Sequence, residues 1–398
     1  MRVSTNAIHR TGIEAIQRGQ SELARTQLQM SSGKRILTPS DDPNGAVHAL
    51  QLRQSIAAVE QFGRNATYAT TRLNQEETVL QQMGGALDRV RELAVQAANA
   101  TQTDESRRAI AVELRQIRTS FVDLANTRDA NGEYLFAGFR STTRPFVNDA
   151  SGDVEYLGDE GQRFLALSPD RQVAVGDSGD ALMTVPRGNG VFVVSPDAAN
   201  AGSAWVRASE VVDPAAITPE SYTITMLTTT DYEVRDSSAT LVSAGTWSPG
   251  QAIDFAGRRI VLEGVPAAGD SYSVDPAGTE SVFGMIDDLI GALEGPTPDA
   301  ASRARLNNDV GLALQNLDQS LGRLLEVRTR VGARLNTIES QGLVDDDRKL
   351  LLQTTLSQVE DLDYAEAVSR FALQQAALEA AQQTYAEMSR LSLFDYIR

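Results

Sequence analysis

Few residues of this chain have the types and spacings that catalysis or metal binding requires. The 398 residues include no cysteine and only two histidines, His9 and His48. Neither histidine has a Cys, His or carboxylate partner at a metal-ligand spacing such as HExxH. The lack of cysteine removes disulfides, thiolate nucleophiles and zinc–thiolate sites. We therefore expect no metal site and no cofactor.

Two acidic clusters are the remaining candidates for chemistry. Asp345-Asp346-Asp347 comes directly before a run with helical periodicity, and Asp41-Asp42 comes directly before Pro43. Carboxylates at a helix start accept hydrogen bonds from unpaired amides and oppose the helix dipole, so capping is favoured over cation binding. The sequence has neither a P-loop nor a GxSxG motif. We expect no catalytic residues and no enzymatic activity.

Composition restricts the class of protein further. A chain of this length, with 41% hydrophobic residues, predicts two or three domains with a real core. No apolar run reaches the length of a membrane span, and no cleavable signal peptide is visible. The net charge is −17, and residues 141–280 hold 8 Lys or Arg against 20 Asp or Glu. This acidic surface repels phosphates, so we expect neither nucleic-acid nor membrane binding.

Long apolar stripes dominate both ends of the chain. Spacings that alternate between three and four place each stripe on one helix face and predict a partner helix. The first stripe contains Leu52, Ser55, Val59, Phe62, Ala66, Ala69, Leu73, Glu76, Leu80, Met83, Leu87, Val90, Ala94 and Ala97. The second contains Val310, Leu314, Leu317, Leu321, Leu324, Arg328, Val331, Leu335 and Ile338, and the third contains Tyr364, Ala367, Phe371, Gln374, Leu378, Ala381, Tyr385 and Met388.

The N-terminal helix has a weaker stripe. Ile16, Leu23, Met30 and Leu37 recur every seven residues beside Ile13, Gln20 and Gln27. This helix should end near Gly33, because glycine readily takes the left-handed conformation that closes a helix. The long second helix should begin at Pro43, and a third, with an apolar stripe from Ile110 to Leu124, should begin after Thr101–Asp104. The second and third helices are predicted to form an antiparallel hairpin.

The apolar period changes from helical to two in the middle of the chain. Tyr222, Ile224 and Met226 alternate with threonines, and Ile253 to Leu262 predicts two strands around a turn at Ala256-Gly257. The predicted fold class is α+β: an elongated α-helical bundle or coiled coil from both chain ends, with a β-rich inserted domain. The insertion, 140–280, should form one domain or two lobes, with any division between Pro196 and Glu220.

Two terminal motifs carry a resemblance to a known family. The run from Met30 to Ile36 (MSSGKRI), followed by Ser40 to Ala46 (SDDPNGA), resembles the N-terminal signature of the bacterial flagellin family. The run from Arg330 to Asn336 (RVGARLN) resembles its C-terminal motif. Pro43, the run GEYLFAG ending at Gly138 and the terminus LSLFDYI ending at Ile397 resemble the subunits that lie between hook and filament. The resemblance covers 1–140 and 281–398 and is weaker between them.

The resemblance implies an extracellular structural subunit, exported unfolded through the flagellar type III apparatus without signal cleavage. It implies assembly with itself, with flagellin and with the neighbouring junction protein on the hook side. It also implies a cytoplasmic export chaperone at the C-terminal segment. The implied domains are an inner assembly domain of 1–42 and 360–398, disordered in the monomer, a helical rod of 43–139 and 281–359, and the β-rich outer domain 140–280. Candidate assembly or chaperone contacts are Ile16, Leu23, Met30, Phe371, Leu378, Tyr385 and Met388.

Two other functions remain open from the sequence. The first is a filament subunit, because filament subunits share the helical stripes. The second is an extracellular adhesive or glycan-binding protein that acts through the β module, which would need a concave aromatic-lined site. Trp205 and Trp247 are the only tryptophans and lie in separate segments.

Overall fold

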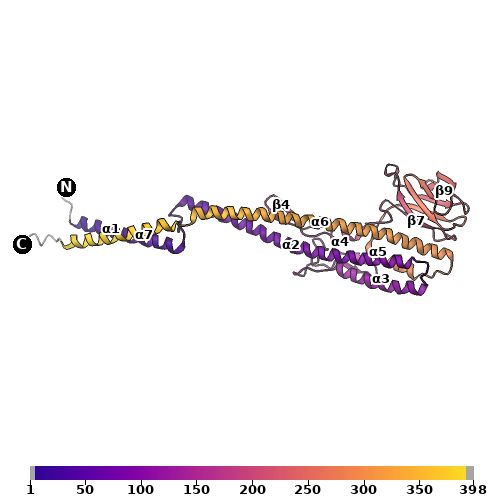
Figure 1. The fold of residues 1–398 in the computed structure, drawn as a ribbon, viewed down its shortest axis with the longest axis horizontal. Coiled ribbons are helices and arrows are strands. Elements are labelled where there is room, and N and C mark those ends of the chain that lie inside the picture. The colour runs from indigo at the N-terminus through magenta and orange to yellow at the C-terminus, as the bar shows by residue number, and fades with distance from the viewer. Residues whose placement is uncertain (1–4, 391–398) are drawn as a thin grey trace, which may run out of the picture. The chain divides into compact units, whose positions relative to one another are not determined.

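The computed structural model describes residues 5–390 and the side chains of residues 9–387. Its helices are α1 (Thr5–Ser32), α2 (Pro43–Ala97), α3 (Asp104–Ala125), α4 (Gly179–Met183), the 3-10 helix η1 (Pro214–Ala216), α5 (Val282–Glu294), α6 (Ala300–Glu360) and α7 (Tyr364–Arg390). The chain divides into two compact units: unit 1 comprises the residues up to Arg64 and from Ser340, and unit 2 comprises Asn65–Glu339. Both α2 and α6 contribute to both units. The predicted α+β class, with helical ends around a strand-rich middle, is confirmed (Figure 1).

The predicted helix boundaries in the N-terminal part are confirmed. α1 ends at Ser32, and Gly33 follows with a φ of +70°. α2 begins at Pro43, where the Asp42 carboxylate accepts a 2.9 Å hydrogen bond from the Gly45 amide. Thr103 is the N-cap of α3, because its hydroxyl accepts a hydrogen bond from the Ser106 amide. Short polar side chains before the first turn therefore set where each helix begins.

The prediction that Asp345-Asp346-Asp347 caps a helix is wrong. All three residues lie inside α6, which continues unbroken to Glu360. Asp345 is buried and accepts a 2.9 Å hydrogen bond from the Gln341 amide group, whereas Asp346 and Asp347 are exposed. The next helix start is at Asp363, whose carboxylate accepts from the amides of Ala365 and Glu366. The acidic run therefore lies inside a continuous helix and does not start one.

The stripes of α2 and α6 meet in unit 2, as predicted. One apolar cluster includes Leu73, Leu80 and Leu87 of α2, Leu317, Leu324 and Val331 of α6, and Leu114 and Phe121 of α3. Gly84 lets the two long helices approach, since a Cβ atom there would lie 3.1 Å from Leu324. The pair Arg89–Glu113 joins α2 to α3, which confirms the predicted hairpin. α5, which the sequence reading did not separate from α6, also packs here through Phe283 against Phe121.

The strands fall into two groups that bury different apolar clusters. The strands are β1 (Phe146–Asn148), β2 (Val154–Tyr156), β3 (Phe164–Ser168), β4 (Arg171–Ala174), β5 (Thr184–Pro186), β6 (Phe192–Pro196), β7 (Trp205–Val211), β8 (Tyr222–Met226), β9 (Asp231–Asp236), β10 (Leu241–Thr246), β11 (Ala252–Phe255), β12 (Arg258–Glu263), β13 (Ser271–Pro276) and β14 (Thr279–Ser281). The antiparallel pairs β1-β2, β3-β4 and β14-β5 adjoin the helices, and Phe146, Val173 and Val185 belong to the helical cluster.

Residues 192–276 form a lobe with its own core. A five-stranded sheet in the order β10-β9-β8-β13-β6 and a three-stranded sheet in the order β11-β12-β7 share one cluster that extends from Phe192 to Val274. The predicted alternation of β8 is confirmed, because Tyr222, Ile224 and Met226 are buried. The two apolar clusters separate between Val185 and Phe192, before the segment 196–220 where the sequence suggested a division.

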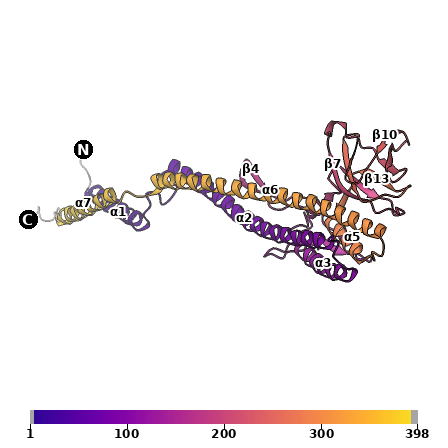
Figure 2. The same cartoon turned by 45° about the vertical axis from the view of Figure 1, so that its right-hand side comes forward.

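The lobe lies beside α6 in Figure 1 and Figure 2. Side-chain amides of α6 hold it there. The Val206 amide donates a 2.7 Å hydrogen bond to Asn308 Oδ1, and the Gly188 amide donates a 2.7 Å bond to Asn316 Oδ1. Both asparagines are buried. The contact therefore depends on backbone amides of the lobe and of its connection. These amides donate hydrogen bonds to two asparagine side chains of α6.

The turn between β11 and β12 generates a testable prediction about the lobe. Gly257 has a φ of +76°, and a Cβ atom there would lie 2.4 Å from the carbonyl oxygen of Asp213. Gly269 has a φ of +95° with no neighbouring atom within 4 Å. Gly269→Ala should therefore lower the free energy of unfolding by roughly 1 kcal/mol, through backbone strain alone. Gly257→Ala should lower it by at least about twice as much, because a clash with the Asp213 carbonyl is added. Tryptophan fluorescence during thermal unfolding reports this, because Trp205 and Trp247 both lie in the lobe. Equal midpoints for the two variants would contradict the turn geometry.

Candidate assembly surface

No constellation for catalysis or metal binding emerges from the described part of the chain. Within it, no group of three or more His, Cys, Asp or Glu side chains could hold a metal ion, and no helix is long and apolar enough to cross a membrane. Trp247 is buried, and its indole N–H donates to the Gln251 carbonyl, so its ring offers no open sugar-stacking face.

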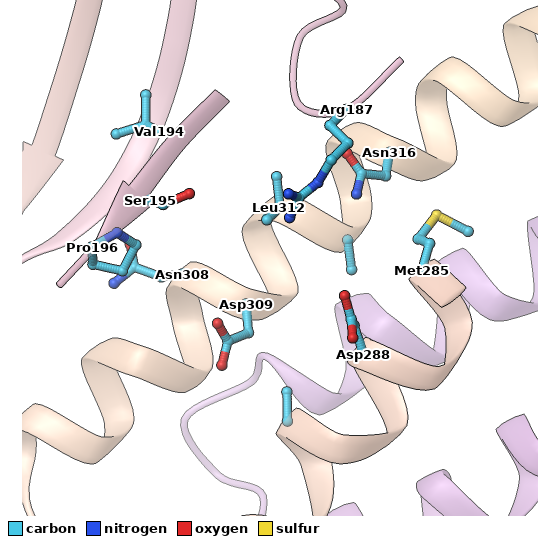
Figure 3. A pocket seen from close by; sticks show the side chains of 12 residues that line it. Arg187, Val194, Ser195, Pro196, Met285, Asp288, Asn308, Asp309, Leu312 and Asn316 are labelled. Carbon is cyan, nitrogen blue, oxygen red and sulfur yellow. The ribbon is translucent and has the colours of Figure 1, made fainter. Parts of the chain in front are cut away.

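A cavity of about 360 Å³ lies between β6, α5 and α6. Figure 3 shows Asp288 of α5 and Asp309 of α6 on its walls, with Arg187 beside Asn316. Arg187 forms an ion pair with Glu280, and burial raises the pKa of the Glu280 carboxyl. Both partners of this pair lie on the two chain segments that connect the lobe to the helices. The cavity thus contains Arg187 and Asn316, which fasten the connection to the lobe.

The two charged residues in the apolar stripes have different environments. Arg328, the exception in the second stripe, forms a 2.6 Å ion pair with Glu77 of α2 at the edge of the helix pair. Glu76, in the first stripe, is only 1% exposed, and its Oε2 atom has no hydrogen-bond partner. Glu76 Oε1 accepts a 3.1 Å hydrogen bond from the Asp177 amide.

Arginines surround the Glu76 carboxyl on two sides. The Asp177 carboxylate receives 2.8 and 3.0 Å hydrogen bonds from Arg334 of α6. Arg72, one helical turn before Glu76, is buried, forms an ion pair with Asp129 and donates a 3.0 Å bond to the Val175 carbonyl. These contacts fasten the segments around 129 and 175–177 to the two long helices. Sequence reasoning missed the cluster because its members lie far apart in the chain.

Glu76 is the titratable group that this environment changes most clearly. Its pKa is raised to about 8, because burial and the neighbouring Asp177 charge raise it by more than Arg334 and Arg72 lower it. At neutral pH the carboxyl is therefore mainly protonated. A neutral carboxyl can lie in an apolar stripe at far lower cost than a carboxylate.

In unit 1, α1 packs against α7, as Figure 1 shows. A Cβ atom at Gly12 would lie 2.8 Å from the Tyr385 ring, and one at Gly19 would lie 3.3 Å from Leu378. Thr26, seven residues further, donates a 2.7 Å hydrogen bond to the Gln374 side chain. Small residues every seven positions on α1 thus receive larger side chains of α7. The seven-residue repeat of small residues is present in the sequence. A search for apolar side chains does not find it, because glycine has no side chain.

Two of the predicted contact residues, Leu378 and Tyr385, lie in the contact between α1 and α7. Leu378 and Tyr385 contact α1 within the same chain, and the Tyr385 ring also meets His9 edge to face. The remaining predicted residues with described side chains, Ile16, Leu23, Met30 and Phe371, are half-buried. The Met388 side chain lies outside the described residues. By contrast, Ile13, Gln20 and Gln27, which the sequence placed beside the α1 stripe, are exposed, because the glycine side of α1 faces α7.

Large aliphatic side chains remain exposed on the helices of unit 1. They are Ile13 and Leu28 of α1, Val47 and Leu50 of α2, Leu343, Val344, Leu350 and Leu351 of α6, and Val368 and Leu373 of α7. Exposed apolar side chains are common at sites of protein–protein contact, so these residues are candidates for such contacts. We define these residues as the candidate assembly surface.

Comparison with known proteins agrees with these features. Residues 3–141 match the family model of the bacterial flagellin N-terminal helical region. Flagellar hook-associated protein 3 of Escherichia coli is 27% identical over 395 residues, covering 99% of each chain. FlgL of Xanthomonas campestris is 34% identical, with a TM-score of 0.72, over 77% of this chain and 99% of that one. Hook-associated protein 3 of Legionella pneumophila is 33% identical, with a TM-score of 0.75, over 78% and 98%.

The helical ends, the β-rich middle and these matches define a flagellin-like structural subunit of the bacterial flagellum. Similarity along the whole chain is more specific than the flagellin match, which stops at residue 141. The chain belongs to the family of flagellar hook-associated protein 3, also called FlgL, the flagellar junction protein.

The raised pKa of Glu76 predicts an unusual pH dependence of stability. The ordinary pKa is 4.5 and the folded-state value is about 8, so the folded protein binds the proton more tightly than the unfolded chain. This contribution is intact below about pH 4.5 and is lost as pH rises through 8. Glu76→Gln keeps the acceptor without the charge. It should therefore leave stability at pH 5 nearly unchanged and raise it by on the order of 1–3 kcal/mol at pH 9.

Urea unfolding of both proteins across this pH range measures the effect. Glu113→Gln, which removes one exposed carboxylate paired with Arg89, is the control for a general change in net charge. If the free energy of unfolding changes with pH in the same way for the natural chain and for Glu76→Gln, Glu76 is not the group whose ionisation changes the stability.

Proposed function

We propose that the protein forms an adaptor ring that joins the hook side of the flagellum to the flagellin filament. Its neighbours would be further copies of itself, the first hook-associated protein and flagellin. The observation that carries this proposal is the full-length similarity to hook-associated protein 3 together with the candidate assembly surface on unit 1. The role is structural and needs no catalysis. The protein would act outside the cell after export without a cleaved signal.

The proposal assigns different roles to the parts of the chain. Residues 1–42 and 360–398 would form an inner assembly domain that is disordered in the free monomer. Residues 43–139 and 281–359 would form the rod, and 140–280 the outer domain. Physical support comes from α1, which buries little beyond one stripe and has glycines at two of its contact positions. A helix of this kind is nucleated poorly unless neighbours cover it.

The same reasoning suggests how a cytoplasmic export chaperone would hold the C-terminal segment. The α7 side chains that contact α1, Leu378 and Tyr385, would be available when α1 is not folded against them. An amphipathic helix whose apolar stripe is uncovered fits a hydrophobic groove. A chaperone would therefore compete with α1 for one face of α7, and assembly would restore a helical partner.

An adaptor differs from a filament subunit in how far it polymerises. Purified full-length protein, seeded or unseeded, should form no long filament, whereas purified flagellin under the same conditions should elongate. In cells that lack their own junction protein, expression of this chain should retain flagellin on the hooks. Electron microscopy measures both results. Filaments of unlimited length from this protein alone would make it a filament subunit.

Hydrogen exchange tests the proposed order of folding. In the free chain, amides in 1–42 and 360–398 should exchange at least about tenfold faster than those of α3, and they should become protected in isolated flagella. α3, which is packed against α5, is the internal reference. Strong protection of both terminal segments in the free chain would contradict disorder in the monomer.

A further inference from the structure

A cavity of about 320 Å³ lies within unit 1, where the connection after α1 meets the start of α2. Aliphatic side chains form most of its wall: Ile36, Leu37, Pro39, Ala46, Ala49 and Leu50. Backbone hydrogen bonds hold the connection in place, because the Arg35 amide donates to the Glu360 carbonyl and the Leu362 amide donates to the Gly33 carbonyl. Contacts within one copy of the chain therefore hold the wall in its shape once these segments have folded.

The other end of this cavity is cationic. Lys34, Arg53 and Glu360 line it, and both cations form ion pairs with the one buried Glu360 carboxylate. Lys34 and Arg53 each remain about half exposed. Two positive charges that share one negative charge leave a net positive end beside an apolar wall. An occupant that matches it has aliphatic side chains next to a carboxylate.

One face of α6 has this chemistry. Leu343, Val344, Asp347, Leu350 and Leu351 are spaced by one, three, three and one residues, which places them on one side of a helix. Asp346 lies at the edge of the same face. All six are exposed, and the exposed fractions of Leu350 and Leu351 are 64% and 67%. These aspartates cap nothing and lie among exposed leucines.

We propose that this α6 face, residues 343–351, docks into the cavity lined by Leu37, Leu50, Lys34 and Arg53 in a second copy of the chain. The leucines cover the aliphatic wall, and Asp346 and Asp347 meet the cationic end. The proposal rests on the proposed function, because it names the surfaces by which copies in the ring meet.

The two surfaces belong to different parts of unit 1, so the contact is heterologous. Contacts of this kind build rings or helical assemblies rather than closed pairs. The ten residues of α6 from Leu350 to Glu360 span about 15 Å, so adjacent copies would be displaced along α6 by about that distance. The charge match also fixes the direction, because the acidic face of one copy cannot approach that of another without repulsion.

Cysteine cross-linking tests this contact with little background, because the chain has no cysteine of its own. Leu50→Cys and Leu350→Cys, on two differently tagged full-length copies, are co-expressed in cells that depend on this chain for their flagella. Mild oxidation of isolated flagella should give at least ten times more disulfide-linked dimer from the mixture than from either variant alone. Leu325→Cys replaces Leu350→Cys as the control, since Leu325 is 62% exposed on the same helix.

A second comparison tests the charges. Asp346→Lys should lower incorporation into flagella at least threefold, whereas Glu339→Lys, an exposed acid elsewhere on α6, should leave it unchanged. Flagella that contain both cysteine variants but give no linked dimer above the Leu325→Cys control would overturn this contact and leave the proposed function intact. If the unsubstituted chain does not enter flagella at all, the proposed function itself fails.

Discussion

The packing of the α2 stripe against α6 is the interaction on which the rest of unit 2 depends. Leu73, Leu80 and Leu87 of α2 belong to one apolar cluster with residues of α6, and Leu324 of α6 packs close to Gly84. α3 and α5 then add to the same apolar cluster, as do the strands before Pro186. The lobe of 192–276 is attached to α6 and not to this cluster. A change in the distance between α2 and α6 would therefore alter the packing of α3, of α5 and of these strands, and the position of the lobe.

Periodicity and local chemistry predicted much of this arrangement. A stripe of fourteen positions from Leu52 to Ala97 has one physical solution, a long helix with a helical partner, and α2 is that helix. Gly33, Pro43 and Thr103 set helix ends through conformational freedom or hydrogen bonding that act within a few residues. The Ala256-Gly257 turn was equally local, and both residues have positive φ values. Features decided by neighbours in sequence can be read from sequence.

Features decided by distant residues could not be read in the same way. Asp345 resembles a cap because acids often precede helices, yet its burial depends on the surrounding packing and on Gln341. Glu76 looked like a simple interruption of an apolar stripe, and only the arrival of Asp177 and Arg334 explains it. The division between the two β clusters depends on which strands pair, as with β7 and β12, which are about fifty residues apart. The surface of α1 that contacts α7 was missed because two of its contact positions, Gly12 and Gly19, are glycines.

The attachment of the lobe through Asn308 and Asn316 has a consequence for variation. Both asparagines accept hydrogen bonds from backbone amides, which every residue except proline possesses. Substitutions on the exposed surface of the lobe can thus alter its charge and shape without removing the bonds that hold it. The surface of the lobe can therefore differ in sequence while Asn308 and Asn316 keep the same bonds to its backbone.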